Sequence, residues 1–171
     1  MSDTKPRRKV TFKTLQKKMA AGEPITQLAA YDYRTAVVAD RLGMDILCVS
    51  DTGGMILFGH QSTTAVSFDE VMMMSKAIDR GSQYGLRMVD MPYWSFHVSP
   101  EQAVENAGRF VHEANAEVMK CEGNANHARN IEAIVKPASQ FKAMLALPRC
   151  AFLNLVDFLL KVKTSIVQNV W

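Results

Sequence analysis

The segment DILCVSD, at residues 45–51, contains a run of four apolar side chains and ends on the carboxylate of Asp51. The pattern recurs twice downstream, where LRMVD ends on Asp90 and EVMKCE ends on Glu122. These acidic residues are 39 and 32 positions apart, enough for one strand and one crossover helix each time. Parallel strands end at one edge of a sheet, about 4.8 Å apart. The pattern therefore predicts three carboxylates able to converge on one cation, at the edge where α/β enzymes hold their ligands.

Strand and helix signals alternate along the rest of the chain. The predicted strands are 25–30, 45–50, 86–89 and 117–121, and the predicted helices are 11–21, 33–42, 67–80, 99–114 and 127–136. Capping boxes, Ser67 with Glu70 and Ser99 with Gln102, open two of the helices. Strands that alternate with helices in this way indicate right-handed crossovers and a parallel sheet. The segment 52–54 is predicted to be a loop.

The length of the chain limits how much of a barrel it can form. A complete (β/α)8 barrel needs about 250 residues, whereas this chain has 171 residues and about four strand–helix units. We therefore predict an α/β fold with about half the units of such a barrel over residues 1–136. Residues 137–171 break the alternation and form an apolar tail, for which we predict one or two helices.

Composition excludes several classes of protein. The net charge of +3 comes largely from a basic leader at residues 5–9, and no basic stripe with interleaved aromatic residues suggests nucleic-acid binding. The three cysteines form no metal-binding pattern and are expected to be reduced thiols. No apolar stretch has the roughly 18 residues of a membrane span, and the N-terminus lacks a signal-peptide core. We expect a cytoplasmic protein, or a mitochondrial one in a eukaryote, without a membrane partner.

The strand-end acids favour a magnesium site. Mg²⁺ prefers oxygen ligands, keeps several of its waters, and often binds one or two carboxylates together with the substrate. The alternative is that such acids only cap the helices that follow their strands. Asp32 is a possible fourth member of the set, although helix capping explains it equally well.

Two further side chains lie beside these acids in the sequence. Lys120 is two residues before Glu122, so both point to the same side of the strand. A lysine within a buried strand needs a partner, which is either a substrate carboxylate or a salt bridge at the strand end. Thr52 offers a hydroxyl next to Asp51, and the glycines after it allow a tight turn where backbone amides meet an anion. The alternative is that Gly54 only relieves a steric problem.

Three other residues have weaker signals. Ser95 is compatible with a mobile loop at the active site. His60 is a candidate catalytic residue, but structural hydrogen bonding is the simpler explanation. Cys121 alternates away from Lys120 and is predicted to lie in the core.

Four blocks of the sequence resemble one enzyme family. They are AYDYRTAVVADRLGMDILCVSDTGGMILFGHQST, VDMPYWSF, SPEQAVENAGRF and MKCEG, in that order. Together they resemble the ketopantoate hydroxymethyltransferase family, over about residues 10–136. The family belongs to the phosphoenolpyruvate/pyruvate-type (β/α)8 barrels, so the resemblance implies that residues 1–136 are the N-terminal part of such a TIM barrel and that residues 137–171 are a divergent apolar tail. The resemblance implies hydroxymethyl transfer from 5,10-methylenetetrahydrofolate to 3-methyl-2-oxobutanoate, giving 2-dehydropantoate for pantothenate synthesis. It also implies Mg²⁺ as cofactor and a homo-oligomer.

The resemblance also implies roles for individual residues. The metal aspartates of the family fall on Asp51 and Asp90, and its third acid, near the metal directly or through water, falls on Glu122. Thr52 replaces a serine that contacts the substrate, and Lys120 matches the lysine that binds the substrate. Asp51, Thr52, Asp90 and Lys120 are therefore the predicted substrate-binding residues.

The chain also departs from the family. Ser50 and Gly53 stand where glycine and leucine are common in the family. After residue 136 the expected strand, the Gly-His-x-Gly-Leu motif and the catalytic glutamate are not recognisable, so we predict no general base and impaired catalysis. A truncated or frameshifted product, an alternative transcript and a degenerate paralogue all fit this pattern. A non-catalytic half-barrel that binds a partner, and another 2-oxo-acid lyase or mutase of the superfamily, remain alternative functions.

Overall fold

The computed structural model describes residues 7–136 and 144–146. In chain order its elements are α1 (Phe12–Ala20), β1 (Gln27–Ala29), α2 (Tyr33–Leu42), β2 (Ile46–Val49), α3 (Thr52–Phe58), η1 (Thr63–Ala65), α4 (Phe68–Gly81), β3 (Leu86–Asp90), α5 (Pro100–Ala114), β4 (Val118–Cys121), η2 (Ala125–His127), α6 (Ala128–Val135) and β5 (Met144–Ala146). None of the helices within these described residues is both long and apolar enough to cross a bilayer.

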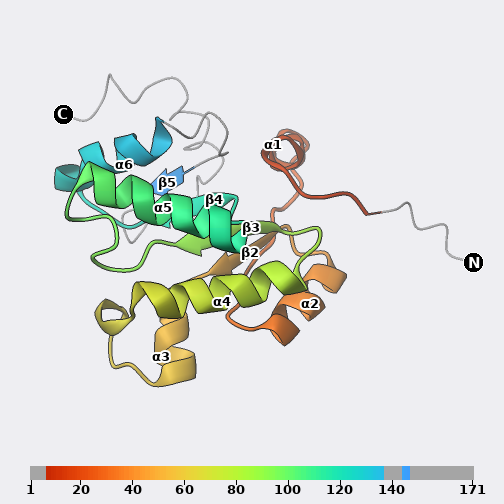
Figure 1. The fold of residues 1–171 in the computed structure, drawn as a ribbon. Coiled ribbons are helices and arrows are strands. Elements are labelled where there is room, and N and C mark those ends of the chain that lie inside the picture. Colours follow the sequence, from red (N-terminus) through yellow and green to blue (C-terminus); the bar gives the residue numbers. More distant parts are fainter. Residues whose placement is uncertain (1–6, 137–143, 147–171) are drawn as a thin grey trace, which may run out of the picture.

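The strands form one parallel sheet in the order β1-β2-β3-β4-β5. Each strand therefore pairs with the next one along the chain, with a helix on each crossover from β1 to β5 (Figure 1). This arrangement confirms the predicted parallel α/β sheet. In its register Asp90 pairs with Lys120, so two of the predicted site residues are direct neighbours across β3 and β4.

Side chains at the helix starts explain where the chain turns into helix. Asp32 accepts a hydrogen bond from the backbone N–H of Thr35, and Ser67 and Glu70 form the predicted capping box. Ser99 accepts from the N–H of Gln102, as expected for an N-cap. The second predicted box is incomplete, because the side chain of Gln102 accepts from the N–H of Val98 instead of Ser99.

The two faces of the sheet contribute to separate cores. Leu47 and Val49 of β2 belong to the larger cluster, which packs the sheet against the crossover helices. Ile46 and Cys48 alternate with them and join a smaller cluster on the opposite face, which includes Leu15 of α1. That opposite face corresponds to the inside of a barrel. It is also the face toward which Asp90 and Lys120 point, by the same alternation.

The prediction that residues 52–54 form a loop is wrong, because they begin helix α3. Two adjacent glycines favour a loop on propensity alone. Here they allow a close approach instead, since a Cβ atom on Gly53 would lie 2.5 Å from both the Met74 sulfur and the Tyr31 ring. A Cβ atom on Gly54 would overlap Val66. Tertiary packing thus selects the helix against the local preference.

The predicted helical tail is wrong at one segment. Met144–Ala146 forms β5, a parallel strand that pairs with β4 through Met119, Lys120 and Cys121. The backbone of β4 offers hydrogen-bonding groups along its outer edge, and pairing with them outweighs the helical preference of this stretch. The rest of the predicted tail, residues 137–143 and 147–171, lies outside the described residues.

Candidate active site

The candidate site is centred on Lys120, whose ammonium bridges two acids. Its Nζ atom lies 2.6 Å from Oδ1 of Asp90 and 2.6 Å from Oε1 of Glu122. The side chains of Lys120 and Asp90 are only 16% and 5% exposed, whereas that of Glu122 is half exposed. The predicted shared direction of Lys120 and Glu122 is therefore confirmed. The salt bridge that the sequence left open as an alternative partner for Lys120 is present. It joins Lys120 to Asp90, which is also a predicted substrate-binding residue.

Burial and charge shift the acidity of this pair in a consistent way. Burial raises the pKa of Asp90 to about 6, although the neighbouring Lys120 opposes the shift. Burial also disfavours the charge on Lys120, but the carboxylates of Asp90 and Glu122 outweigh it and raise the lysine's pKa. Both groups are therefore charged at neutral pH. A buried acid with a raised pKa beside a fixed cation is a frequent feature of functional sites.

Asp51 lies two positions after the end of β2 and occupies the N-cap position of α3. Its carboxylate makes no capping hydrogen bond to that helix, so the capping alternative does not explain it within the described chain. Asp32, in contrast, does cap its helix. Burial raises the pKa of Asp51, and Glu122 adds to that effect while Lys120 opposes it. These influences place Asp51 in the same electrostatic environment as the other two acids.

The side chains that are present fit a hard divalent cation. Oδ2 of Asp90 is buried and accepts no well-formed hydrogen bond from the described residues, whereas the hydroxyl of Ser50 is near enough to this carboxyl to oppose the rise of its pKa. A buried carboxylate oxygen without a partner is costly, and a cation beside it would remove that cost. Among residues 7–136 and 144–146, however, no group of three His, Cys, Asp or Glu side chains is already arranged to hold a metal. The convergence of Asp51, Asp90 and Glu122 on one cation stays a prediction.

Thr52 meets a residue that the sequence did not single out. Its Oγ1 shares a 2.8 Å hydrogen bond with the hydroxyl of Tyr31, which follows β1 by two positions. Ser50 was also missed as a site residue. Its hydroxyl lies 3.4 Å from Oδ1 of Asp51 and accepts weakly from the N–H of Thr52. The criterion that selected the acids, a polar residue just after an apolar strand, could have found Tyr31 and Ser50 as well. Each lies within two positions of the end of its strand.

The weaker candidates have structural roles. His60 hydrogen-bonds the carboxylate of Glu70 at 2.8 Å, which supports the structural explanation for this histidine. Ser95 is buried and donates to the carbonyl of Pro92 at 2.7 Å. Cys121 is fully buried in the larger core, as predicted.

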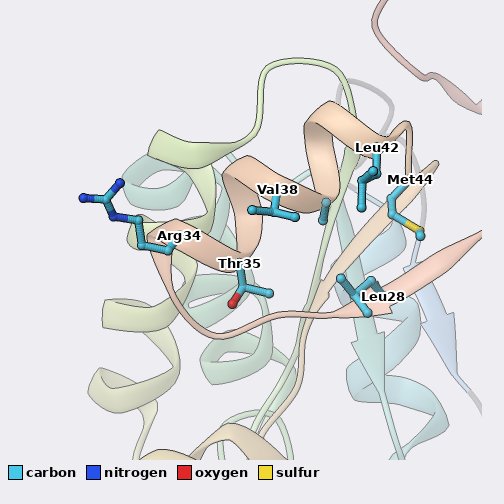
Figure 2. A pocket seen from close by; sticks show the side chains of 7 residues that line it. Leu28, Arg34, Thr35, Val38, Leu42 and Met44 are labelled. Atoms are coloured by element: carbon cyan, nitrogen blue, oxygen red, sulfur yellow. The ribbon is translucent and has the colours of Figure 1, made fainter.

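One cavity lies apart from this site. It has a volume of about 310 Å³ and opens between α2 and edge strand β1 (Figure 2). Its wall is mostly apolar and consists of Leu28, Arg34, Thr35, Val38, Ala39, Leu42 and Met44. Val38 and Leu42 are 56% and 74% exposed, so this side of the described chain has an uncovered apolar surface.

Comparison with known proteins shows similarity over most of the chain. The family model for ketopantoate hydroxymethyltransferase matches residues 9–140. The 3-methyl-2-oxobutanoate hydroxymethyltransferase of Caldicellulosiruptor saccharolyticus is 44% identical over 128 residues, which are 75% of this chain and 48% of that protein. The Dehalococcoides mccartyi enzyme of the same name is 39% identical over 74% of this chain and 46% of its own length. The chain thus spans about half the length of the curated relatives it matches.

Solved structures support the fold. A 2,3-dimethylmalate lyase of the PEP mutase/isocitrate lyase superfamily superimposes with a TM-score of 0.62 at 13% identity, covering 82% of this chain and 54% of the lyase. A phosphonopyruvate hydrolase in complex with oxalate and Mg²⁺ gives 0.56 at 12% identity, covering 90% and 69%. At such identities these likenesses concern the fold alone, and they confirm the parallel α/β fold of a partial barrel. With the family match over residues 9–140, the chain belongs to the ketopantoate hydroxymethyltransferase family.

Proposed function

We propose that this chain carries the metal- and ketoacid-binding half of a ketopantoate hydroxymethyltransferase site. The reaction transfers a hydroxymethyl group from 5,10-methylenetetrahydrofolate to 3-methyl-2-oxobutanoate and forms 2-dehydropantoate, in pantothenate biosynthesis. The observation that carries the proposal is the buried Asp90–Lys120 pair at the carboxyl edge of the sheet, with Oδ2 of Asp90 left without a well-formed hydrogen bond from the described residues. Identities of 39–44% to enzymes of this name support the same reaction.

The carboxylates of Asp51 and Asp90 would hold Mg²⁺, with Glu122 as a ligand directly or through water. When bound there, the ion supplies Lewis acidity for the keto and carboxylate oxygens of the substrate and for the enolate formed from it. Such sites are strongest when water is excluded, and Asp90 already lies in a nearly dry position.

Lys120 and Thr52 would orient the ketoacid. The Lys120 ammonium sits at the strand edge with its charge fixed by Asp90 and Glu122, so it attracts a substrate carboxylate without having to change protonation. Thr52 presents a hydroxyl whose direction is set by Tyr31. These contacts would hold one end of the substrate, so that C3, from which the proton is removed, faces the one-carbon donor.

No general base is assigned to this chain. The acids at the site are engaged with Lys120 or proposed as metal ligands, and loss of a base typically lowers the rate about 10²–10⁴-fold. We therefore propose that the isolated 171-residue chain binds its ligands but turns over slowly. We also propose a homo-oligomer, with the 2-oxo acid and the folate as its small-molecule partners.

A non-catalytic half-barrel that binds another protein is the second candidate. The observation in its favour is the apolar surface on α2 beside edge strand β1, where Val38 and Leu42 are exposed. A lyase or mutase of the same superfamily has less support, since its solved members are only 11–13% identical to this chain, compared with 39–44% for the hydroxymethyltransferases.

Two measurements on the purified, monodisperse chain test these proposals. Calorimetry with 3-methyl-2-oxobutanoate, with and without Mg²⁺, should show metal-dependent ketoacid binding. Absence of any such binding would contradict the hydroxymethyltransferase assignment and favour the half-barrel. Folate-dependent ketopantoate formation should be close to background. Turnover of about 1 s⁻¹ or more, an ordinary enzymatic rate, would contradict the slow-turnover proposal and show that the chain contains a base.

A further inference from the structure

The loop between β3 and α5 exposes two large aromatic side chains beside the candidate site. Tyr93 and Trp94 are 50% and 60% exposed and begin three residues after Asp90. Their ring centroids are 5.7 Å apart and their planes are inclined by 41°, so the two rings form one aromatic patch with faces in two directions. Aromatic rings exposed beside a strand end that carries buried charges offer a flat apolar surface to a ligand bound there.

Buried side chains hold the loop that carries these rings in place. Phe96 is fully buried and anchors the loop in the larger core. The side-chain amides of Asn106 and Asn130 donate to the carbonyls of Ser95 and Phe96, at 2.7 and 2.8 Å. With these contacts the backbone is held in one conformation. The two rings are therefore presented on a preorganised support, which lowers the entropy cost of binding.

The backbone at Trp94 is held in an unfavourable conformation. Its φ angle is +71°, in the left-handed region that bulky residues avoid. Its N–H donates to Nδ1 of His97 at 3.1 Å, and the two rings are stacked with an interplanar angle of 10°. Strain of this kind persists where the surroundings enforce it, and it is concentrated at ligand-binding sites. In this conformation the Trp94 side chain is exposed to solvent while its backbone N–H is held by His97.

The aromatic group borders the acids of the candidate site. The imidazole of His97 packs against that of His127, with centroids 4.6 Å apart. A Cβ atom built on Gly123 would lie 3.3 Å from His127 and 3.4 Å from Phe96. Gly123 directly follows Glu122. The exposed rings are thus connected by direct packing to the strand end that carries the Lys120 ion pairs.

We propose that Tyr93 and Trp94 form the stacking platform for the pterin ring of the one-carbon donor. This inference rests on the proposed function, which requires a planar heteroaromatic co-substrate beside the ketoacid. Flat heterocycles stack on exposed aromatic side chains with a substantial gain in affinity. The platform lies at the same sheet edge as Asp90 and Lys120, so a ring stacked there borders the ketoacid bound by those residues.

The test uses the full 171-residue chain and two halves of the folate. 6-Methyltetrahydropterin and 4-aminobenzoylglutamate are titrated separately by calorimetry under anaerobic conditions. We expect the pterin to bind, and Trp94→Ala to weaken its binding about tenfold, the usual scale for loss of one stacking partner. Trp94→Phe should keep most of the affinity. Tyr84→Ala is the matched control, because Tyr84 precedes β3 and therefore lies at the opposite edge of the sheet from Asp90.

Several results would overturn the inference. Equal pterin affinity in Trp94→Ala and the unchanged chain would do so, as would binding only of 4-aminobenzoylglutamate. A Trp94→Ala chain that changes its oligomeric state but keeps its pterin affinity would show that the rings contact another protein. If Trp94→Ala does not fold, Tyr93→Ala and Trp94→Phe supply the same comparison.

The same samples separate this inference from the proposed function. Metal-dependent ketoacid binding is measured alongside the pterin titration. Ketoacid binding without pterin binding would overturn the platform and leave the proposed function in place. Pterin binding that depends on Trp94, without ketoacid binding, would support the platform and contradict the proposed reaction.

Discussion

The ammonium of Lys120 lies 2.6 Å from Oδ1 of Asp90, while Oδ2 of the same carboxylate is buried and accepts no well-formed hydrogen bond from the described residues. One oxygen of Asp90 is therefore committed to an internal cation and the other is available to an external one. This division is what allows a single aspartate to connect the proposed metal site to the proposed carboxylate-binding lysine.

Replacing Asp90 by asparagine should weaken binding of Mg²⁺ or Mn²⁺ at least about tenfold, or 1.4 kcal/mol. The amide keeps the shape of the side chain but loses the charge that a divalent ion requires. Calorimetric titration with Mn²⁺ measures the effect. Asp69→Asn is the control, because the Asp69 side chain is 88% exposed. Equal metal affinity in both variants would contradict the metal assignment.

Replacing Lys120 by alanine should reduce the affinity for 3-methyl-2-oxobutanoate more than the affinity for the metal. In the proposed site the lysine would supply the positive charge for the ketoacid carboxylate. Breaking a buried ion pair also leaves Asp90 unpaired, which typically costs about 3–5 kcal/mol of stability. Ketoacid titrations at saturating Mn²⁺ and urea unfolding measure the two effects. Lys76→Ala, which removes a more exposed salt bridge to Glu113, is the control. Unchanged ketoacid affinity would reduce Lys120 to a structural role.

Asp40 should make stability depend on pH in the acidic range. Burial opposes its charge, but hydrogen bonds from the backbone of Gly85, Tyr84 and Gln83 outweigh burial and hold its pKa below the usual 3.8. Because the folded pKa is lowered, this stabilisation is present above about pH 4 and is lost as the pH falls through the lower folded pKa.

Asp40→Ala should therefore cost about 3 kcal/mol at pH 7, since several hydrogen bonds to a charged group are lost. The difference between the variant and the unchanged chain should shrink near pH 3. Urea unfolding at both pH values measures it. A difference that stays constant from pH 7 to pH 3 would show that the ionised form of Asp40 is not what stabilises the turn before β3.

Replacing Gly53 by alanine should destabilise the chain by about 1–3 kcal/mol, the usual range for overpacking a core. The added methyl group would meet the Met74 sulfur and the Tyr31 ring at 2.5 Å. Displacement of Tyr31 would also disturb its hydrogen bond to Thr52. Gly108→Ala is the control, because nothing lies within 4 Å of that position on α5. There the helix propensity of alanine should stabilise by up to about 1 kcal/mol. Thermal unfolding distinguishes the two, and equal midpoints would contradict the packing argument.

The alternation of apolar runs with capped helices was enough to predict the parallel sheet. The spacing of apolar residues, the N-cap residues and the glycines after helices are local signals. The bounds of α2 were therefore predicted without error, from Asp32 before the helix and Gly43 after it. The position of Asp51, Asp90 and Glu122 at the ends of apolar runs likewise predicted that they lie at one edge of the sheet, because parallel strands all have their carboxyl ends there. The direction of Lys120 toward Glu122 followed from strand alternation.

Only the tertiary structure decided the features that depend on non-local contacts. Helix α3 packs so closely against Tyr31, Val66 and Met74 that only glycine fits at positions 53 and 54. Strand β5 pairs with the edge that β4 offers. The partners of Asp90 are equally invisible in the sequence, since the cost of a buried carboxylate depends on which donors the fold brings within reach. The sequence by itself determined where the charges lie along the chain, whereas the fold determined which of them meet.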